Sequence, residues 1–169
     1  MYPSLTAIQE DCYVSSAEKS LLCSAMAPIV LVLRKPVAAI SSWVAPDNPY
    51  LGVMLPYTPL HYLLLQALKR PIVATSGNRA SEPICIDNQE ALEQLQDCAD
   101  FFLVHNRPII NRVDDSIARV MAAQMTLIRR SRGFTPLPIE LNESTQAPIL
   151  GVGGHLKNTV AYMQGNQLM

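Results

Sequence analysis

Pro71-Ile-Val-Ala-Thr-Ser-Gly-Asn78 is the stretch of this sequence that points most directly to a fold class. Its apolar run stops abruptly at Thr75-Ser76-Gly77-Asn78, which predicts a buried strand that ends in polar groups at a sheet edge. In open α/β sheets, ligands bind outside the carboxyl ends of the strands. Ser76 and Asn78 would lie on one side of the extended chain, and Gly77 would let a ligand approach the backbone. A strand followed by an Asn-capped turn is the alternative interpretation.

Composition and charge narrow the class of protein. The chain has 169 residues, of which 49% are hydrophobic and 16% charged, as in a globular protein rather than a disordered one. The net charge of -1 provides no basic field that would recruit nucleic acid or an anionic membrane. No apolar run is long enough to span a membrane and no signal peptide is visible, so we expect a cytoplasmic protein. The four cysteines are scattered without a C-x-x-C pair, which indicates reduced thiols and no zinc site.

Caps and periodicity predict alternating strands and helices on both sides of the opening stretch. Strands are predicted over residues 29–33, 52–55, 72–78, 101–104 and 126–128, with further strands around residues 109–120. Helices are predicted over residues 3–12 and 15–24, after an N-cap at Thr58 with Pro59 at N1, and after an N-cap at Asp87. The strand–helix–strand order over residues 52–78 predicts a right-handed crossover between parallel strands, and hence an α/β fold.

The helix predicted after Thr58 is expected to be mostly buried, because leucines recur along one face. These leucines are Leu60, Leu63, Leu64 and Leu68. His61 lies on the same helix. Because no second catalytic side chain lies nearby in the sequence, we interpret His61 as a hydrogen-bonded core or edge histidine.

A polar segment, residues 142–148, is interpreted as a linker between two parts of the chain. Residues 1–141 form the first domain in this interpretation. Residues 149–169 contain a strand, a Gly-rich turn and a second strand, and they are expected to begin a second domain, because two strands cannot bury a core alone. The turn does not match the P-loop spacing, yet its backbone N–H groups suit a phosphate. Its candidate phosphate ligands are Gly153, Gly154, Lys157, Asn158 and Thr159.

Arginines concentrate in the second half of the chain. Residues 116–139 contain no acidic side chain, and several arginines follow the end of a predicted strand. The group consists of Arg107, Arg112, Arg119, Arg129, Arg130 and Arg132. Such arginines suit the phosphates of a nucleotide or of an RNA backbone, because each can act as a bidentate donor. A solvated basic edge strand that resists aggregation fits the same pattern.

Two adjacent carboxylates, Asp114 and Asp115, precede Ser116 near these arginines. Mg²⁺ binds through one or two carboxylates together with phosphate oxygens, so this pair is a candidate magnesium contact. The competing interpretation is a turn in which the carboxylates form salt bridges with Arg112.

Several segments taken together resemble a known family. Pro71-Ile-Val-Ala-Thr-Ser-Gly-Asn78 resembles the T-S-x-N signature of YrdC-like domains, which make carbamoyl-type adenylates from ATP. Further segments are similar to the HypF family of hydrogenase-maturation carbamoyltransferases, in order along nearly the whole chain. These segments are residues 52–61, 105–109, 112–116, 129–134 and 152–159. The resemblance implies a twisted, open, mixed α/β sheet with flanking helices (YrdC-like, N-terminally incomplete), followed by the first β-hairpin of an actin-like ATPase-fold transferase domain.

The same resemblance implies a function. In that family, carbamate made from carbamoyl phosphate is joined to AMP from ATP with Mg²⁺, and the carbamoyl group then passes to the C-terminal cysteine of a partner maturation protein. Ser76 and Asn78 match half of a Lys/Arg/Ser/Asn tetrad that holds substrate and ATP. Further substrate and ATP contacts are expected among Thr75, His105, Arg107, Arg112, Asp115, Ser116, Arg129, Arg130 and Arg132.

The K-x-R half of the tetrad has no match in this sequence, so we expect a missing N-terminal portion and no activity of this fragment alone. Two other functions stay open at this point. One is a threonylcarbamoyl-adenylate synthase that serves tRNA modification. The other is a non-catalytic module that binds nucleotide or RNA through the arginines.

Overall fold

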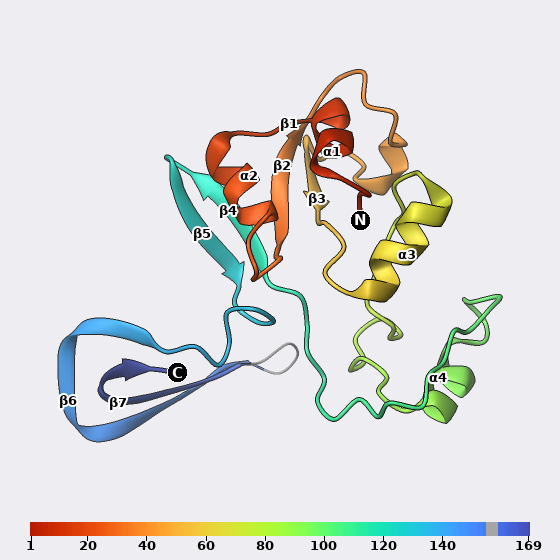
Figure 1. The fold of residues 1–169 in the computed structure, drawn as a ribbon. Helices are drawn as coiled ribbons and strands as arrows, with labels where there is room; N and C mark the ends of the chain where they lie inside the picture. The colour runs from red at the N-terminus through yellow and green to blue at the C-terminus, as the bar shows by residue number, and fades with distance from the viewer. Residues whose placement is uncertain (155–158) are drawn as a thin grey trace. The chain divides into compact units, whose positions relative to one another are not determined.

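The computed structural model describes residues 1–154 and 159–169, and the chain divides into two compact units (Figure 1). Unit 1 comprises Met1–Ser76 and Val113–Gly133, and unit 2 comprises Gly77–Arg112 and Phe134–Met169. In the described part of the chain, no helix is both long and apolar enough to cross a membrane.

Unit 1 is built on a five-stranded mixed sheet. Its strands are β1 (Cys12–Tyr13), β2 (Ile29–Arg34), β3 (Tyr50–Val53), β4 (Ile117–Met121) and β5 (Gln124–Arg129). Its helices are α1 (Leu5–Asp11), α2 (Ser16–Leu22), the short 3₁₀ helix η1 (Ser42–Val44) and α3 (Pro59–Leu68). Strand β2 pairs antiparallel with β1 and β3 and parallel with β4, and β4 pairs antiparallel with β5. The expected α/β fold with a mixed sheet and flanking helices is confirmed.

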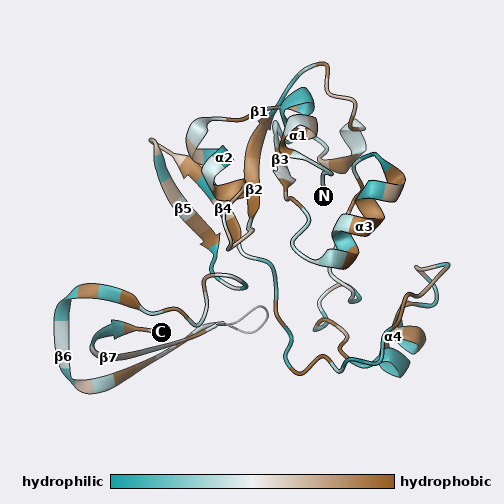
Figure 2. Cartoon of the chain, in the orientation of Figure 1, coloured by the Kyte–Doolittle hydropathy of each residue, from teal (hydrophilic) through white to brown (hydrophobic). Residues whose placement is uncertain are grey.

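The core of unit 1 forms along β2, which Figure 2 shows as strongly apolar. Val30 and Val32 are fully buried, because alternate residues of a strand point to the same face of the sheet. They belong to one cluster with Ile8 of α1 and Leu22 of α2. Each such side chain contributes roughly 1.5–3 kcal/mol on burial. This cluster therefore stabilises the sheet, and polar residues lie at the ends of its strands β4 and β5.

The predicted helix starts are confirmed by their caps. Ser15 and Glu18 form a complete capping box at the start of α2. The Thr58 hydroxyl oxygen accepts a hydrogen bond from a backbone N–H of α3, and Asp87 does the same for α4 (Asn88–Leu95). These contacts join residues two or three positions apart, which is why the sequence alone predicts them.

The expectation that α3 is mostly buried is wrong. Leu65 is buried, but Leu60, Leu63 and Leu64 are 51%, 65% and 44% exposed. The apolar stripe exists as the sequence predicts, yet no described helix or strand packs extensively on it. Periodicity identifies which face a helix will bury, whereas the neighbouring element decides how much of that face is covered.

The stretch over residues 71–78 does not form the predicted strand. Consequently the predicted crossover to it from residues 52–55 is wrong, and the parallel pair of the sheet is β2 with β4. Among the described residues, Ile72 pairs only with Met1, through two backbone hydrogen bonds. A strand needs a neighbour along its length to satisfy its backbone groups, and the described chain supplies a neighbour at one residue.

Unit 2 contains α4 and a hairpin of two strands, β6 (Ile139–Val152) and β7 (Val160–Leu168). The predicted strand at residues 101–104 is wrong, and no regular strand forms over residues 109–113. Phe101 and Leu103 are 93% and 80% exposed. These apolar runs have no pairing partner in the described part of the chain, so local strand propensity is not expressed.

The hairpin confirms two strands near the end of the chain, but the segment before the second domain is not irregular as expected. Residues 142–148, expected to be an irregular linker, lie inside β6. The register of the β6–β7 pair shifts between Glu140 and Thr145 and again between Thr145 and Ile149, so bulges accommodate the polar residues within a long strand. The domain boundary itself stays a prediction. Of the predicted phosphate turn, Gly153 and Gly154 follow β6 and Thr159 precedes β7, whereas Lys157 and Asn158 lie outside the described residues.

Candidate functional site

A polar cluster lies in unit 1 where β4 begins and β5 ends. Asp114 and Asp115 come just before β4, whereas Arg129 ends β5 and Arg132 follows it. The antiparallel pairing of the two strands matches Ile117 with Arg129 and so brings both ends together. Asp115 and Arg132 also form an isolated backbone bridge beyond the strands. Acidic and basic groups therefore meet because a hairpin closes between them.

The guanidinium of Arg132 is held on two sides. Its Nε and Nη2 lie 2.9 and 2.8 Å from Oδ1 of Asp115. Nη2 also donates to the carbonyl oxygen of Ala27 at 2.8 Å, and Nη1 donates to that of Met26 at 3.4 Å. The two charged side chains are only 23% and 27% exposed. Water screens such a pair less than a surface pair, so removing one partner leaves a poorly solvated charge.

Tyr57 and His61 cover this pair from the start of α3. The centre of the Arg132 guanidinium lies 3.6 Å from the centroid of the Tyr57 ring, a cation–π contact. The Tyr57 and His61 rings meet edge to face, with centroids 4.7 Å apart. Burial raises the pKa of Tyr57, and the nearby charge of Asp115 acts in the same direction. Sequence reasoning did not identify Tyr57 as a site residue; its only sequence signal is its position next to the cap of α3.

His61 differs from the hydrogen-bonded histidine expected from the sequence. Its Nδ1 is buried and has no hydrogen-bond partner within the described residues. Buried polar atoms are normally paired, so an unpaired one in a polar cluster indicates a position where a ligand group or water can bind. Burial lowers the pKa of His61, Arg132 acts in the same direction and Asp115 opposes them. The imidazole is therefore neutral at pH 7, with one donor and one acceptor nitrogen.

Ser116, just before β4, is hydrogen-bonded to the residues that follow β5. It is fully buried, its hydroxyl donates to the carbonyl oxygen of Arg132 at 2.9 Å, and it accepts from the N–H of Ser131 at 2.7 Å. The hydroxyl is thus used within the protein, and a direct contact of Ser116 with ATP stays a prediction.

The two carboxylates form a salt-bridged turn, but with other arginines than expected. Asp115 pairs with Arg132, and Asp114 lies 3.4 Å from Arg129. Arg112 instead donates to the carbonyl oxygen of Ile84 at 2.7 Å, and it lies 3.9 Å from Glu90. The expected partner was wrong because sequence proximity does not decide which side chains a hairpin brings together.

This turn does not fit a magnesium site. Oδ1 of Asp115 already accepts from two nitrogens of Arg132, and Asp114 faces Arg129. Within the residues that the structure describes, no three His, Cys, Asp or Glu side chains gather as metal ligands. A hard cation binds best to carboxylate oxygens that are not already paired with arginine, so this turn offers Mg²⁺ no suitable ligand.

The residues of the opening stretch fall in both units. Thr75 and Ser76 end the first segment of unit 1 and are exposed, and in the described chain neither forms a hydrogen bond with the polar cluster. Asn78 belongs to unit 2, where its Nδ2 donates to the carbonyl oxygens of Arg79 and Glu82 at 2.8 and 3.0 Å. Its Oδ1 is buried without a hydrogen-bond partner among the described residues. The Asn78 Nδ2 therefore holds the loop over residues 79–82 in place, and the Asn78 Oδ1 is an acceptor without a partner among the described residues.

Two further predicted residues line a cavity within unit 2. His105 and Arg107 border a space of about 390 Å³ together with Asp87 and Asn88 at the start of α4. The His105 Nδ1 accepts from the N–H of Arg107 at 3.2 Å, and its carbonyl oxygen accepts from Asn88 at 3.3 Å. The cavity has charged groups of both signs, so its geometry alone does not select an anion.

The His61 environment predicts a pH dependence. Because the pKa of His61 is lowered from 6.5 in the folded chain, the unfolded chain binds the proton more readily. The His61 contribution to stability is therefore fully present above about pH 6.5 and is lost as the pH falls towards the folded pKa. An NMR titration should show the His61 ring signals changing at lower pH in the folded chain than in urea. Coincident titration curves in the two states would contradict the burial of this ring.

Known proteins match this chain over most of its length. The Sua5/YciO/YrdC family model, described as telomere recombination, matches residues 1–131. The chain is 52% identical over 167 residues to carbamoyltransferase HypF of Synechocystis sp., and 41% identical over 150 residues to a probable carbamoyltransferase HypF of Methanocaldococcus jannaschii. These matches cover 99% and 87% of this chain but 22% and 19% of the relatives. The chain thus spans about a fifth of their length.

Solved structures agree with the sequence relatives. Full-length HypF in a phosphate- and nucleotide-bound form matches with a TM-score of 0.90 and 46% identity, over 98% of this chain and 26% of that one. HypF of T. kodakarensis matches with a TM-score of 0.91 and 38% identity, over 99% of this chain and 22% of that one. The resemblance and the fold expected from the sequence are both confirmed.

Proposed function

The chain belongs to the Sua5/YciO/YrdC family, and we propose that it contributes part of the ATP site of a HypF-type carbamoyltransferase. The observation that carries this proposal is the cluster of two arginines and two aspartates at the ends of β4 and β5, covered by Tyr57 and His61. The reaction proposed for the whole protein joins carbamate, made from carbamoyl phosphate, to AMP and then transfers the carbamoyl group to the C-terminal cysteine of a maturation partner.

Formation of an acyl adenylate makes limited demands on the protein. The carbamate oxygen must be held near the α-phosphorus, and negative charge must be stabilised on the departing pyrophosphate. Neither task needs a nucleophilic side chain. A cluster of arginines with neutral hydrogen-bonding groups suits both tasks, because guanidinium groups bind phosphate oxygens in pairs.

The two arginines of the cluster suit different roles. Arg132 has short contacts to Asp115 and Ala27, so we assign it to positioning the loop. The contacts of Arg129 with Asp114 and with the Asp115 carbonyl oxygen are both 3.4 Å, and its side chain is 35% exposed. Turning Arg129 towards a phosphate would therefore cost less, so Arg129 is the proposed phosphate ligand.

The amide of Asn78, which belongs to unit 2, suits a carbamoyl group. Its buried Oδ1 is an acceptor without a partner among the described residues, while its Nδ2 already holds the loop. A carbamoyl group carries N–H donors that would satisfy this oxygen, whereas a bare carboxylate would not. Ser76 is exposed and offers a hydroxyl next to this loop in the sequence, in keeping with the expected substrate role of both residues.

Calorimetric titration of the chain with ATP tests the proposal. We expect Arg129→Ala to weaken ATP binding by roughly tenfold or more, because a hydrogen bond to a charged group is worth about 1.5–3 kcal/mol. Arg79→Ala is the matched control, since Arg79 pairs with Asp97 on an exposed surface, where the two side chains are 49% and 80% exposed. Equal affinity of wild type and Arg129→Ala would contradict the assignment.

Two further titrations separate the alternatives. Tighter ATP binding in the presence of threonine, but not of carbamoyl phosphate, would favour a threonylcarbamoyl-adenylate synthase. Salt-sensitive binding of a structured RNA without binding of ATP would favour a nucleic-acid module, because phosphate contacts to a polynucleotide weaken steeply with ionic strength. Binding of ATP that is insensitive to added RNA supports the proposed function.

A further inference from the structure

The imidazole ring of His61 lies at one side of the polar cluster in unit 1. The His61 N–H donates to the Thr58 hydroxyl oxygen at 3.2 Å, which anchors the residue in the first turn of α3. The Tyr57 ring meets the imidazole edge to face, with centroids 4.7 Å apart, and Tyr57 also lies against the Arg132 guanidinium. The backbone cap and the aromatic contact together restrict where the two ring nitrogens can lie.

The Nδ1 atom of this ring is buried and has no hydrogen-bond partner within residues 1–154 and 159–169. Burial is the main cause that lowers the pKa of His61; after it, Asp115 raises and Arg132 lowers that pKa, so both charged groups lie near the ring. These two groups are already paired with each other, at 2.8 and 2.9 Å. A buried nitrogen without a partner costs free energy unless another molecule supplies the missing bond.

We propose that His61 binds the nucleotide directly, with its Nδ1 donating a hydrogen bond to an oxygen of the phosphate chain that Arg129 contacts. This inference rests on the proposed function, because it names a further ligand-binding residue of the same ATP site. A neutral imidazole carries one N–H, and its two tautomers place that N–H on either nitrogen. An ionised phosphate oxygen only accepts hydrogen bonds, so it selects the tautomer with the proton on Nδ1.

The neighbours of His61 favour a ligand group that accepts hydrogen bonds. Arg129 and Arg132 carry only donors, so any ligand group that binds them must supply acceptors. A phosphate has several acceptor oxygens around one centre, and it can therefore bind a guanidinium and an imidazole N–H together. An amino group of the ligand would instead place further donors beside the two arginines. The cluster thus favours a phosphate as the partner of His61.

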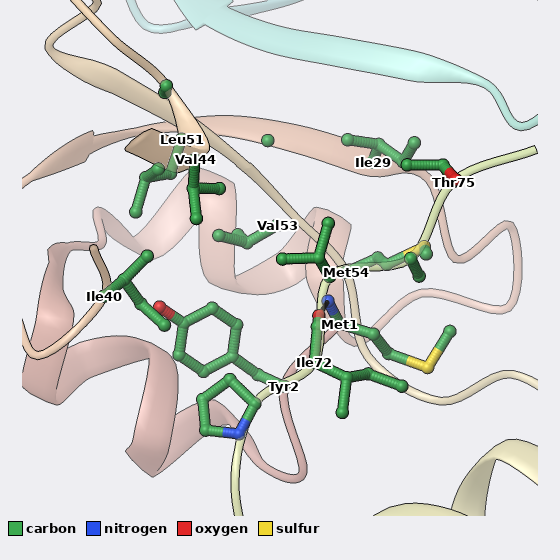
Figure 3. Close-up of a pocket in the computed structure, with 15 residues that line it drawn as sticks. Met1, Tyr2, Ile29, Ile40, Val44, Leu51, Val53, Met54, Ile72 and Thr75 are labelled. Atoms are coloured by element: carbon green, nitrogen blue, oxygen red, sulfur yellow. Dashed lines mark hydrogen bonds between the residues drawn. The ribbon is translucent and has the colours of Figure 1, made fainter. Parts of the chain in front are cut away.

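The apolar pocket of unit 1 is less suited to a phosphate. Figure 3 shows this pocket, of about 290 Å³, with Val53, Met54 and Ile72 among its lining side chains. No arginine or histidine lines it within the described residues. A phosphate placed there would lose its hydration without gaining the paired donors of a guanidinium. Within unit 1, the cluster beside His61 is therefore the favoured phosphate site.

Binding of a phosphate should be coupled to a proton on His61. The charged or titratable side chains near the ring are Tyr57 from the start of α3, Asp115 before β4 and Arg132 after β5. The negative charge of a phosphate beside Nδ1 would stabilise the imidazolium, so ATP should raise the pKa of His61 above its value in the free chain. By reciprocity, the His61 contribution to ATP affinity grows as the pH falls towards that raised pKa.

Two substitutions in the full chain separate binding from packing. His61→Phe keeps a ring against Tyr57 but removes both nitrogens, so it should raise the melting temperature by roughly 4 °C and weaken ATP binding by about tenfold or more. His61→Asn places an amide at the position of Nδ1 and should keep ATP affinity within about threefold of wild type. Tyr62→Phe is the matched control on α3, because Tyr62 is 55% exposed, and it should change neither quantity.

Calorimetry and thermal unfolding of these variants test the inference, together with an NMR titration of wild-type His61 with and without ATP. A loss of affinity in Arg129→Ala but not in His61→Phe would overturn this inference and leave the proposed function standing, whereas no ATP binding by wild type would overturn both. A lower melting temperature of His61→Phe would show that water already pairs with Nδ1, and failure of His61→Asn to bind ATP would assign the loss to ring shape. Either result overturns the inference.

The NMR titration uses the wild-type chain and so decides even if a variant fails to fold. With ATP bound, the His61 ring signals should change at a higher pH than in the free chain, because the phosphate favours the imidazolium. A His61 titration that ATP leaves unchanged would show that no phosphate lies beside the ring, and would overturn the inference.

Discussion

Replacing Gly133 with alanine is expected to lower the free energy of unfolding by roughly 3 kcal/mol or more, the largest single-residue effect that we predict. Gly133 has a φ of +89°, where an L side chain is strained. An added Cβ would lie 2.4 Å from the carbonyl oxygen of Met26 and 2.8 Å from its Cα. Both are backbone atoms, and the Met26 carbonyl oxygen also accepts from Arg132. The loop therefore cannot relax without disturbing the polar cluster.

Urea denaturation measures this effect, and Gly154→Ala is the matched control. Among the described residues, a Cβ at Gly154 would meet nothing within 4 Å, and the φ of Gly154 lies outside the left-handed region. We expect the control to change the free energy of unfolding by less than about 0.5 kcal/mol. Similar effects of the two substitutions would show that the close approach of Gly133 to Met26 does not form in solution.

Replacing Arg132 with alanine is expected to cost about 3 kcal/mol of unfolding free energy. The substitution leaves Asp115 as a partly buried charge without its main partner, and it removes the cation–π contact with Tyr57 and the bonds to Met26 and Ala27. The effect should exceed that of a surface ion pair because the two side chains are mostly shielded from water. ATP binding should weaken as well, since Arg132 shapes the loop that follows β5.

Arg79→Ala serves as the control for this prediction. Arg79 and Asp97 lie 2.9 Å apart, nearly the same distance as Arg132 and Asp115, but both side chains are well exposed. Such surface pairs contribute about 0–1 kcal/mol. Urea denaturation of both variants should therefore give clearly different losses. If the two substitutions cost the same, burial does not strengthen the Arg132 pair, and its assigned role in holding the loop would be wrong.

The helix starts and the central strands could be predicted because their signals are local. The capping box of Ser15 and Glu18 joins residues three apart, and the buried Val30 and Val32 follow from alternation within one strand. The resemblance to YrdC-like and HypF proteins likewise rests on short contiguous segments. For the candidate site, the sequence identified the arginines and aspartates as a group, because residue type and density are visible without a fold.

Which of those residues meet was decided by tertiary structure. The hydrogen bond from Arg132 to Ala27 joins residues 105 positions apart, and the stacking on Tyr57 joins different elements of unit 1. The carboxylates therefore pair with Arg129 and Arg132, although Arg112 is closer in the sequence.

The stretch Pro71-Ile-Val-Ala-Thr-Ser-Gly-Asn78 shows most clearly what the sequence determines and what the tertiary structure determines. The sequence by itself determined an apolar segment that ends in a hydroxyl and an amide, which is a property of residue order. Only the tertiary structure decided that this segment is not a strand, because a strand exists through hydrogen bonds to a neighbour, and in the described chain that neighbour is present at Met1 alone.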